Sequence, residues 1–511
     1  MSKKSIIIIG AGVSGLSAGI YARQHGFDVS IVEKNPRVGG LCTGWYRKNQ
    51  YIDGCIHWLT GTNENCDLDK MWRNVHAYTS QDDLIYLDSF GTYEYQGVRV
   101  PFLKDTKEAE RIWLEISPED KKMIKRFFKM VRDFEKVNSP VFTPPNKLPL
   151  TSLIKFGLRV IKVFPSYLKS MNITCEEFAD KFKHPALVHA IKQLQPGEGN
   201  LFSMLYSYST ITSHSGGVPK GGSVAMINRM NEYYLSLGGK LILNKSVTSV
   251  IINDKKATGV ILNDNQELTC DYLVSACDTR HFLSDILKDK YLKKEFISRS
   301  ENRKRYPTPS CAITYISIKD MLHLSTIYSF DVEPFSVGTQ KIESILLRNY
   351  DYDKSLCPNE SVISIMIDQY QDDYDYWDNL YQSDKDEYNK EKDRMAKEVI
   401  NRIITKFPSL EGKITLLDTF TPLTITRYVN TYKGAYMSFL FTKKNNMYWG
   451  NQKVKGLDNV FLASQWMTSP GGLPFAMTNG VWSIQKICQK ERIKFLLGDE
   501  PSKKIEKEKI G

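Results

Sequence analysis

The sequence predicts an α/β fold in which one parallel sheet is assembled from segments that lie far apart in the chain. Three observations carry this prediction. The first is the β-branched run Ile6–Ile9, which ends at a glycine-rich turn and leads into a helix. The second is a strand, glycine-rich turn and helix near the carboxyl terminus, and the third is a similar arrangement after residue 214. Apolar runs of this kind are typical of strands buried on both faces, as in parallel sheets.

The composition is that of a globular protein with a full core. Of the 511 residues, 41% are hydrophobic and 25% are charged, and the net charge is +11. This charge is modest for the length, so we expect no nucleic-acid partner. No charge-free apolar run reaches the length of a membrane span, and the Ile6–Ile9 run is too short for a secretion signal.

The nine cysteines are scattered and form no CxxC pair, so the sequence favours neither a zinc ribbon, nor an iron–sulfur site, nor a disulfide scaffold. We expect a cytoplasmic protein, with a peripheral position on the inner face of a membrane as the alternative. The acid-rich segment 372–393 is predicted to be an exposed loop leading to a helix; its acids are interpreted as a solvated surface, with a metal site as the alternative, and no metal-binding residues are predicted.

The first glycine-rich turn has the spacing of a dinucleotide-binding motif. Gly10 permits a tight turn out of the strand, Gly12 lets a pyrophosphate approach the backbone, and Gly15 lets the helix pack on the strand. The helix amino terminus offers free N–H groups to the phosphates. A second strand, Asp28–Val32, ends at Glu33, whose carboxylate is placed to accept hydrogen bonds from ribose hydroxyls.

The residues after this acid distinguish between cofactors. A simple nicotinamide domain does not require a Gly-Gly doublet here, but Arg37, Gly39 and Gly40 supply one in the pattern RxGG. The segment resembles that of the two-dinucleotide-binding-domain flavoproteins, in which its backbone lines the pyrophosphate and ribityl chain of FAD. Leu41 stands where relatives carry a basic or small residue.

The carboxyl-terminal part resembles the closing flavin motif of the same family. A strand-like segment at 456–463 leads to a turn at 464–474 and then to a helical run. In relatives this turn packs against the isoalloxazine and ribityl chain, and many carry an acid near the position of Gln465. An amide can still bind a ribityl hydroxyl.

The centre of the chain resembles the middle flavin-domain segment of this family. The glycine-rich stretch 216–223 opens a predicted helix, and strand-like segments follow at 240–262. In relatives a strand residue near Val247 contacts adenine through its backbone; otherwise Val247 is an ordinary strand residue. The residues predicted to bind FAD are therefore Gly10, Gly12, Ser14, Gly15, Glu33, Lys34, Arg37, Gly39, Gly40, Leu41, Val247, Gln465, Gly472, Leu473 and Pro474.

Together these blocks resemble the phytoene desaturase, carotenoid isomerase and retinol saturase group, over roughly half of the chain. The resemblance implies a two-dinucleotide-binding-domain flavoprotein fold. Its discontinuous Rossmann-like FAD domain would comprise residues 1–66, 214–278 and 452–490. An α+β substrate domain would comprise 67–213 and 279–451, followed by a charged tail at 491–511.

Two further segments supply candidate site residues. Asp53 and His57 keep the spacing of a segment that the saturase branch writes as Phe-Asp-x-Gly-Ile-His. His57 is therefore the candidate catalytic residue, as a proton donor or a hydrogen-bond partner of the cofactor; a structural histidine is the alternative. Arg427 and Tyr428 are candidates for the border of the substrate cavity, against a surface ion pair and a core aromatic.

One stretch has the composition of a membrane-docking segment. No acid occurs between Glu135 and Glu176, and a helical pattern within 150–170 combines basic, apolar and aromatic residues. Such a helix suits a membrane interface, from which a peripheral enzyme could draw a lipid. The alternative is a helix whose apolar face packs on the core.

These features lead to one main hypothesis and two alternatives. The main hypothesis is an FAD-dependent oxidoreductase that acts on a C–C bond of an apolar isoprenoid or polyene lipid by hydride transfer with flavin N5, as a desaturase, saturase or isomerase. The alternatives are a flavin amine oxidase and a non-catalytic prenyl-lipid binding protein on the same fold. No second GxGxxG motif predicts an NAD(P) domain, so the electron partner is external: oxygen, a quinone or another donor or acceptor.

Overall fold

The computed structural model of the chain describes residues 3–64, 66–137, 150–151, 154, 157–158, 161, 163–195, 199–291, 294–319, 324–358, 360–445 and 450–498. Part of the predicted docking segment at 150–170 and the tail from residue 499 onward lie outside the described residues. Within the described ranges, no helix has both the length and the apolar character that a membrane crossing requires.

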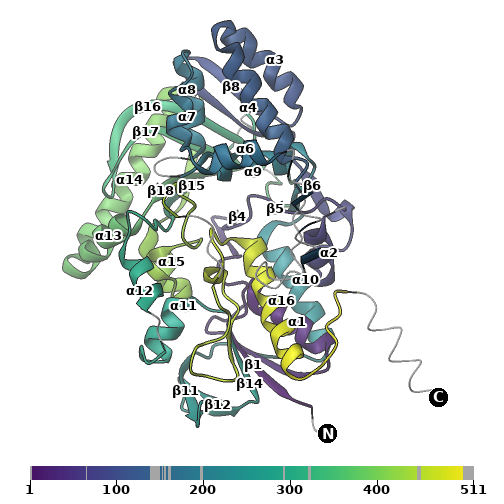
Figure 1. Cartoon of the computed structure of the whole chain (residues 1–511). Coiled ribbons are helices and arrows are strands. Elements are labelled where there is room, and N and C mark those ends of the chain that lie inside the picture. Colours follow the sequence, from purple (N-terminus) through teal and green to yellow (C-terminus); the bar gives the residue numbers. More distant parts are fainter. Residues whose placement is uncertain are drawn as a thin grey trace.

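A five-stranded parallel sheet joins segments from both ends and the centre of the chain (Figure 1), in the order β10-β2-β1-β14-β20. This confirms the predicted α/β fold. The central strand β1 is buried because both faces of the sheet are covered by other elements. The strands are β1 (Ser5–Ile9), β2 (Asp28–Val32), β10 (Lys240–Ile242), β14 (Tyr272–Ser275) and β20 (Val460–Leu462).

Three helices from the same distant segments pack together on one side of this sheet. They are α1 (Val13–Gln24), α10 (Gly222–Ser236) and α16 (Leu473–Lys490). Gly480 lies where α16 meets α1, and a side chain there would contact the backbone oxygen of Ser14. A small antiparallel sheet follows α10, formed by β11 (Val247–Asn253), β12 (Lys256–Leu262) and β13 (Glu267–Thr269).

A second, seven-stranded sheet has the order β19-β15-β18-β17-β16-β7-β8. Its side chains alternate between two environments, as the pleat of a strand requires. In β18 the residues Ile363, Ile365 and Ile367 enter a core beneath α13 and α14. The strands are β7 (Ser89–Tyr95), β8 (Val98–Leu103), β15 (Ser310–Ile318), β16 (Ile327–Val337), β17 (Gln340–Asn349), β18 (Ser361–Gln369) and β19 (Ile414–Phe420).

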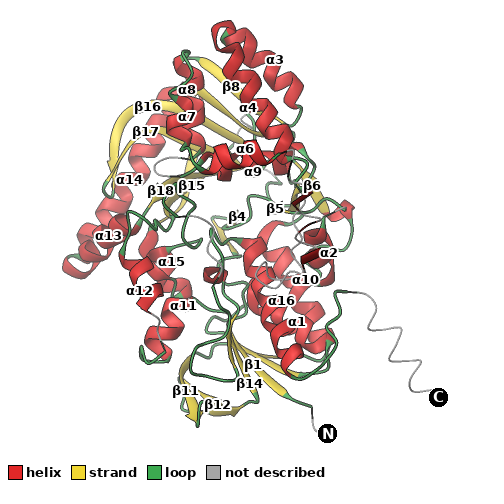
Figure 2. Cartoon of the chain, viewed as in Figure 1, coloured by secondary structure: helices red, strands yellow, loops and turns green. Residues whose placement is uncertain are grey.

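Helices cover the remaining parts of the second sheet (Figure 2). An aromatic core fills the space between β7, β8 and the helices α3, α4, α7, α8 and α9. These helices, with α6 beside α9, are α3 (Thr106–Ile116), α4 (Lys121–Phe134), α6 (Phe164–Met171), α7 (Cys175–Ala179), α8 (Pro185–Leu194) and α9 (Leu201–Thr212). The other described elements are β3 (Gly44–Arg47), β4 (Gln50–Asp53), β5 (Leu59–Thr60), α2 (Asp67–Asn74), β6 (Leu84–Tyr86), β9 (Gly216–Pro219), α11 (Thr279–His281), α12 (Lys294–Glu301) and α15 (Pro422–Val429).

The prediction of an exposed loop at 372–393 is wrong. This segment forms helix α13 (Gln371–Ser383) and the start of α14 (Lys385–Lys406). Asp373 is buried, and its carboxylate accepts hydrogen bonds from the backbone N–H groups of Thr339 and Tyr370, the second of which caps α13. An acid that caps a helix satisfies free N–H groups, which is why the acid-rich composition was misleading.

Candidate functional site

A single cavity of about 1420 Å³ lies between the parallel sheet and the seven-stranded sheet. Its walls include both glycine-rich turns, at Gly12 and Gly472, together with the central segment at Val247. Every predicted site residue lines this cavity except Gly15, which lies behind the turn. The structure therefore brings the amino-terminal, central and carboxyl-terminal segments to one continuous space.

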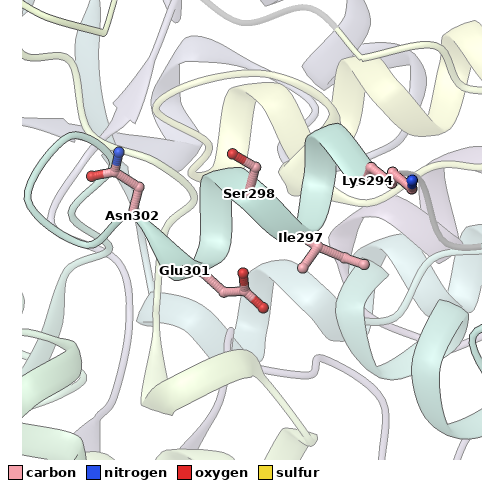
Figure 3. Close-up of a pocket in the computed structure, with 5 residues that line it drawn as sticks. All are labelled: Lys294, Ile297, Ser298, Glu301 and Asn302. Atoms are coloured by element: carbon pink, nitrogen blue, oxygen red, sulfur yellow. The ribbon is translucent and has the colours of Figure 1, made fainter.

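A second hollow lies on the surface of α12 (Figure 3). It has a volume of about 400 Å³, and its lining comes from one helix and the residue that follows it. Figure 3 shows that Lys294 and Asn302, at its two ends, point away from each other. The large cavity is therefore the candidate site.

The first turn is built so that a ligand can approach its backbone. A Cβ atom on Gly15 would lie 1.9 Å from the oxygen of Gly10, so only glycine permits the close contact between helix and strand. A Cβ atom on Gly12 would meet only the oxygen of Gly39, at 3.7 Å, so this position borders open space. The RxGG segment is held against the turn because Gly39 donates its N–H to the oxygen of Ala11, at 2.9 Å.

Glu33 is buried at the end of β2 and is held by backbone groups. Its carboxylate accepts the N–H of Ala11 at 2.8 Å and the N–H of Asn35 at 2.9 Å. A carboxylate has about four acceptor positions, so capacity remains for hydroxyl groups in the cavity. This buried acceptor beside a turn without side chains fits the adenosine and pyrophosphate parts of FAD.

The surface formed by the first glycine-rich turn, Glu33, the RxGG segment and the carboxyl-terminal turn is called the cofactor cradle below. Neighbouring residues stabilise this cradle. Arg37 donates to the carbonyl of Gly44 at 3.0 Å, and Ser14 donates its hydroxyl to the carbonyl of Ala463. Lys34 donates to the side chain of Asn430 at 2.7 Å. The Ser14 and Lys34 bonds tie the first motif to the carboxyl-terminal part of the chain, and the Arg37 bond fixes the segment that follows the RxGG pattern.

The carboxyl-terminal turn depends on Gln465. Its amide oxygen accepts the N–H of Gly472 at 2.7 Å, and its amide nitrogen donates to the carbonyl of Tyr436 at 3.1 Å. The side chain is thus engaged within the protein and holds the turn. Helix α16 begins directly after Gly472, with Pro474 in its first turn, so its amino terminus borders the cavity.

His57 faces the cavity and is electrostatically coupled to Arg348. The side chain is exposed to the cavity, but the surrounding cavity walls desolvate it, and this desolvation together with the positive charge of Arg348 lowers the pKa of His57 to about 3. The imidazole is therefore uncharged near neutral pH. Of its predicted roles, a hydrogen bond to the cofactor is the one that an uncharged ring performs most readily.

The position of His57 is set by two buried charged residues. Asp53 accepts hydrogen bonds from the N–H and hydroxyl groups of Ser223, at 2.5 and 2.6 Å, and so joins this segment to α10. Arg348 donates to the carbonyl of His57 at 2.7 Å and lies over the ring of Tyr350. Among the described residues, its Nε and Nη1 atoms have no hydrogen-bond partner.

Arg427 and Tyr428 lie beside the cofactor segment rather than at the apolar end of the cavity. Asn35 donates to the carbonyl of Tyr428 at 3.3 Å, and the Tyr428 hydroxyl lies 3.3 Å from that of Thr43. Arg427 stacks over the ring of Tyr381, with its guanidinium carbon 5.2 Å from the ring centre. The substrate role of both residues stays a prediction.

Sequence reasoning missed the sheet face that forms one wall of the cavity. Ser364, Met366 and Asp368 of β18 line it, as do Leu346 and Arg348 of β17. The period-2 alternation of β18 was the available signal, because it separates these residues from the three isoleucines in the core. Which face meets the cavity depends on the register between strands.

Residues 13–481 match the family described as flavin containing amine oxidoreductase. The lycopene-forming phytoene desaturase of Paracoccus sp. is 26% identical over 299 residues, which is 56% of this chain and 56% of that enzyme. The 4,4'-diapophytoene desaturase of Methylomonas sp. is 22% identical over 537 residues, covering 96% of both chains.

Solved structures share the fold at low sequence identity. An oxidoreductase from Methanosarcina mazei superposes with a TM-score of 0.57 at 15% identity, covering 94% of this chain and 100% of that chain. A variant of putrescine oxidase superposes with a TM-score of 0.52 at 13% identity, covering 96% of this chain and 99% of that chain.

Proposed function

The chain belongs to the family of flavin-containing amine oxidoreductases, and from this premise we propose that it acts on a C–C bond of an apolar isoprenoid or polyene lipid. It is an FAD-dependent oxidoreductase. When bound, FAD accepts or donates a hydride at N5. The residues of the chain hold the lipid in the cavity and keep water from it.

The observation that carries this proposal is the apolar end of the cavity. Beyond the glycine turns, its walls are formed mainly by aromatic and aliphatic side chains, among them Trp58, Phe90, Phe134, Leu346, Met366 and Phe441. A pocket of this kind binds its ligand chiefly by burial of apolar surface, worth about 25 cal/mol per Å². A long hydrocarbon suits it better than a charged amine does. The two desaturases that resemble the chain act, by their names, on phytoene and diapophytoene.

We further propose that the lipid enters from a membrane surface beside α6. Phe164, Tyr167 and Tyr206 line the cavity, and 49% of Phe164 and 37% of Tyr206 is exposed. Neighbouring apolar side chains are also exposed: Leu150, Ile154, Leu158, Ile161 and Leu168. Several exposed apolar side chains in one acid-free segment are typical of an interfacial helix. The absence of acids from 136 to 175 favours an anionic membrane surface.

The reaction is tested with the purified flavoprotein under anaerobic conditions. Phytoene and 4,4'-diapophytoene are supplied in liposomes to the oxidised enzyme, and carotenoids with more double bonds to the photoreduced enzyme. Putrescine and spermidine serve as the amine comparison. We expect the flavin absorbance to change only with the lipids, together with a product that differs by one double bond. Turnover of the amines with no reaction of the lipids would contradict the proposal.

Membrane docking is tested by sedimentation with phosphatidylglycerol vesicles. The exposed fraction of Ile161 is 64%, so Ile161→Asp places a charge where we expect an apolar contact. Leu235→Asp is the matched control, because Leu235 is 44% exposed on α10, away from the patch. Loss of one buried side chain of this size costs about 1.5–3 kcal/mol, so we expect binding to fall at least tenfold for Ile161→Asp only. Equal binding of both variants would rule out docking through this patch.

A further inference from the structure

The seven-stranded sheet contributes two acids to the cavity lining, Asp368 of β18 and Asp418 of β19. Asp418 accepts a hydrogen bond from Trp45 and pairs with Arg47, so Asp368 is the acid of interest. Asp368 lies near the end of β18, opposite Cys311 of β15 in the antiparallel register. It shares the cavity face of the strand with Ser364 and Met366. Its side chain is therefore directed toward the substrate space by the pleat of the strand and not into the core beneath α13 and α14.

Within the described part of the chain, the Asp368 carboxylate forms no ion pair and no hydrogen bond. The titratable groups that face it are Tyr93 of β7, Cys311 of β15, Tyr370 at the end of β18, and Tyr436. Burial is the main cause of a raised pKa in each of these groups, so all four are neutral at pH 7. The same desolvation raises the pKa of Asp368 to about 6.

Asp368 also lies close to the part of the cradle that the closing flavin motif forms. Its charge contributes, after burial, to the raised pKa of Tyr436. The carbonyl of Tyr436 accepts the amide of Gln465 at 3.1 Å, and Gln465 in turn accepts the N–H of Gly472 at 2.7 Å. One electrostatic interaction and two hydrogen bonds thus connect the acid to the carboxyl-terminal turn.

A carboxyl group in this setting suits proton transfer better than His57 does. General acids and bases work best when their pKa lies near the working pH. The pKa of His57 is lowered to about 3 by desolvation and by Arg348, so its neutral ring is a weak base. An unpaired carboxylate in an apolar cavity is costly unless it binds a polar group or exchanges a proton.

We propose that Asp368 is the catalytic residue that exchanges a proton with a carbon atom of the lipid. This inference rests on the proposed function. In the oxidative direction, one substrate carbon loses hydrogen together with its bonding electron pair to FAD. The adjacent carbon loses a proton to the Asp368 carboxylate, and the electrons of that C–H bond form the second bond of the new double bond. In the reductive direction the protonated acid would return the proton to that carbon, and the hydride would come from the reduced cofactor when it is bound.

The test compares Asp368→Asn and Asp368→Glu with Glu343→Gln in the FAD-loaded protein. Glu343 is an exposed acid on β17 of the same sheet, outside the cavity, so it is a control for loss of charge. The rate of anaerobic flavin reduction by phytoene in liposomes is measured by stopped flow. We expect Asp368→Asn to lower this rate by about 10²–10⁴-fold, the usual contribution of a general acid or base. FAD content should stay unchanged, Asp368→Glu should retain part of the rate, and Glu343→Gln should match the wild type.

The pH profile and infrared spectra give independent measurements. The oxidative rate of the wild type should rise as the pH increases through about 6, because the acceptor must be ionised. Infrared difference spectra between pH 4.5 and pH 8 should contain a titrating carboxyl band that is absent in Asp368→Asn and present in Glu343→Gln. The spectra do not depend on turnover, so they apply even to a variant with low activity.

Three results would overturn the assignment. The first is an Asp368→Asn rate within threefold of the wild type. The second is a wild type that lacks the titrating carboxyl band. The third is turnover of amines alone, with Asp368→Asn raising KM and leaving kcat unchanged; this would make Asp368 an anchor for a cation and would contradict the proposed function as well. Lipid turnover with an unaffected Asp368→Asn variant would contradict only the assignment of the acid.

Discussion

The contact between α1 and α16 predicts a large effect of a single added methyl group. In Gly480→Ala, the new Cβ would lie 2.4 Å from the backbone oxygen of Ser14 and 3.2 Å from the backbone nitrogen of Ala18. The helices must separate by about 1 Å to restore ordinary contact. Such overpacking costs about 1–3 kcal/mol, against a gain of up to about 1 kcal/mol from the higher helix propensity of alanine. We expect a net loss of about 1–2 kcal/mol in the stability of the apoprotein.

Gly12→Ala is the informative comparison. Its new Cβ would meet only the oxygen of Gly39, at 3.7 Å, and would otherwise project into the cradle. This variant should keep the stability of the apoprotein within about 0.5 kcal/mol, as substitutions without new clashes usually do. It should nevertheless bind FAD much more weakly, because the backbone is no longer open to the pyrophosphate.

The two variants are measured by urea unfolding of the apoprotein and by FAD titration with flavin fluorescence. Gly480→Ala should lower the unfolding midpoint, and Gly12→Ala should raise the Kd for FAD without moving the midpoint. Equal midpoints for Gly480→Ala and the wild type would refute the close packing of the two helices. Unchanged FAD binding by Gly12→Ala would refute the position of the cofactor.

Three other outcomes follow from the buried acids. Glu33→Gln should weaken FAD binding about tenfold in the same titration, because a charged hydrogen bond is worth about 1.5–3 kcal/mol. Asp53→Asn turns an amide toward the N–H of Ser223 and should cost about 1–3 kcal/mol in urea unfolding. The pKa of Asp368 is about 6 in the folded protein and 3.8 when unfolded. The folded apoprotein therefore binds more protons than the unfolded chain between these pH values. Its free energy of unfolding should fall as the pH rises through this range. The free energy of unfolding should fall by up to about 3 kcal/mol. Asp368→Asn lacks the ionisable group and so avoids this loss, and it should be more stable than the wild type above pH 6. Urea unfolding midpoints of both proteins at pH 4 and pH 7 test this.

The parallel sheet could be predicted from the sequence because its signals are local. The run Ile6–Ile9, the glycine spacing and the terminal acid Glu33 all lie within one βαβ unit. The interpretation of 372–393 failed because composition alone does not show that an acid such as Asp373 caps a helix. The pairing of strands 5–9, 272–275 and 460–462 needed a family resemblance, since no local pattern connects such distant segments.

The cofactor and the substrate end of this cavity differ in how their information is encoded. The cradle is made largely of backbone: glycines such as Gly12, and a helix amino terminus at Gly472. These requirements leave short motifs that can be recognised in one sequence. The opposite wall is made of side chains on separate strands, and residues such as Asp368 are brought to it only by the register between β15 and β18. In β18 an acid follows a run of isoleucines and a methionine, so the strand alone indicates a core position as readily as a catalytic one. Strand pairing therefore determines which side chains face the substrate. A shift of β18 by one residue would turn Asp368 out of the cavity.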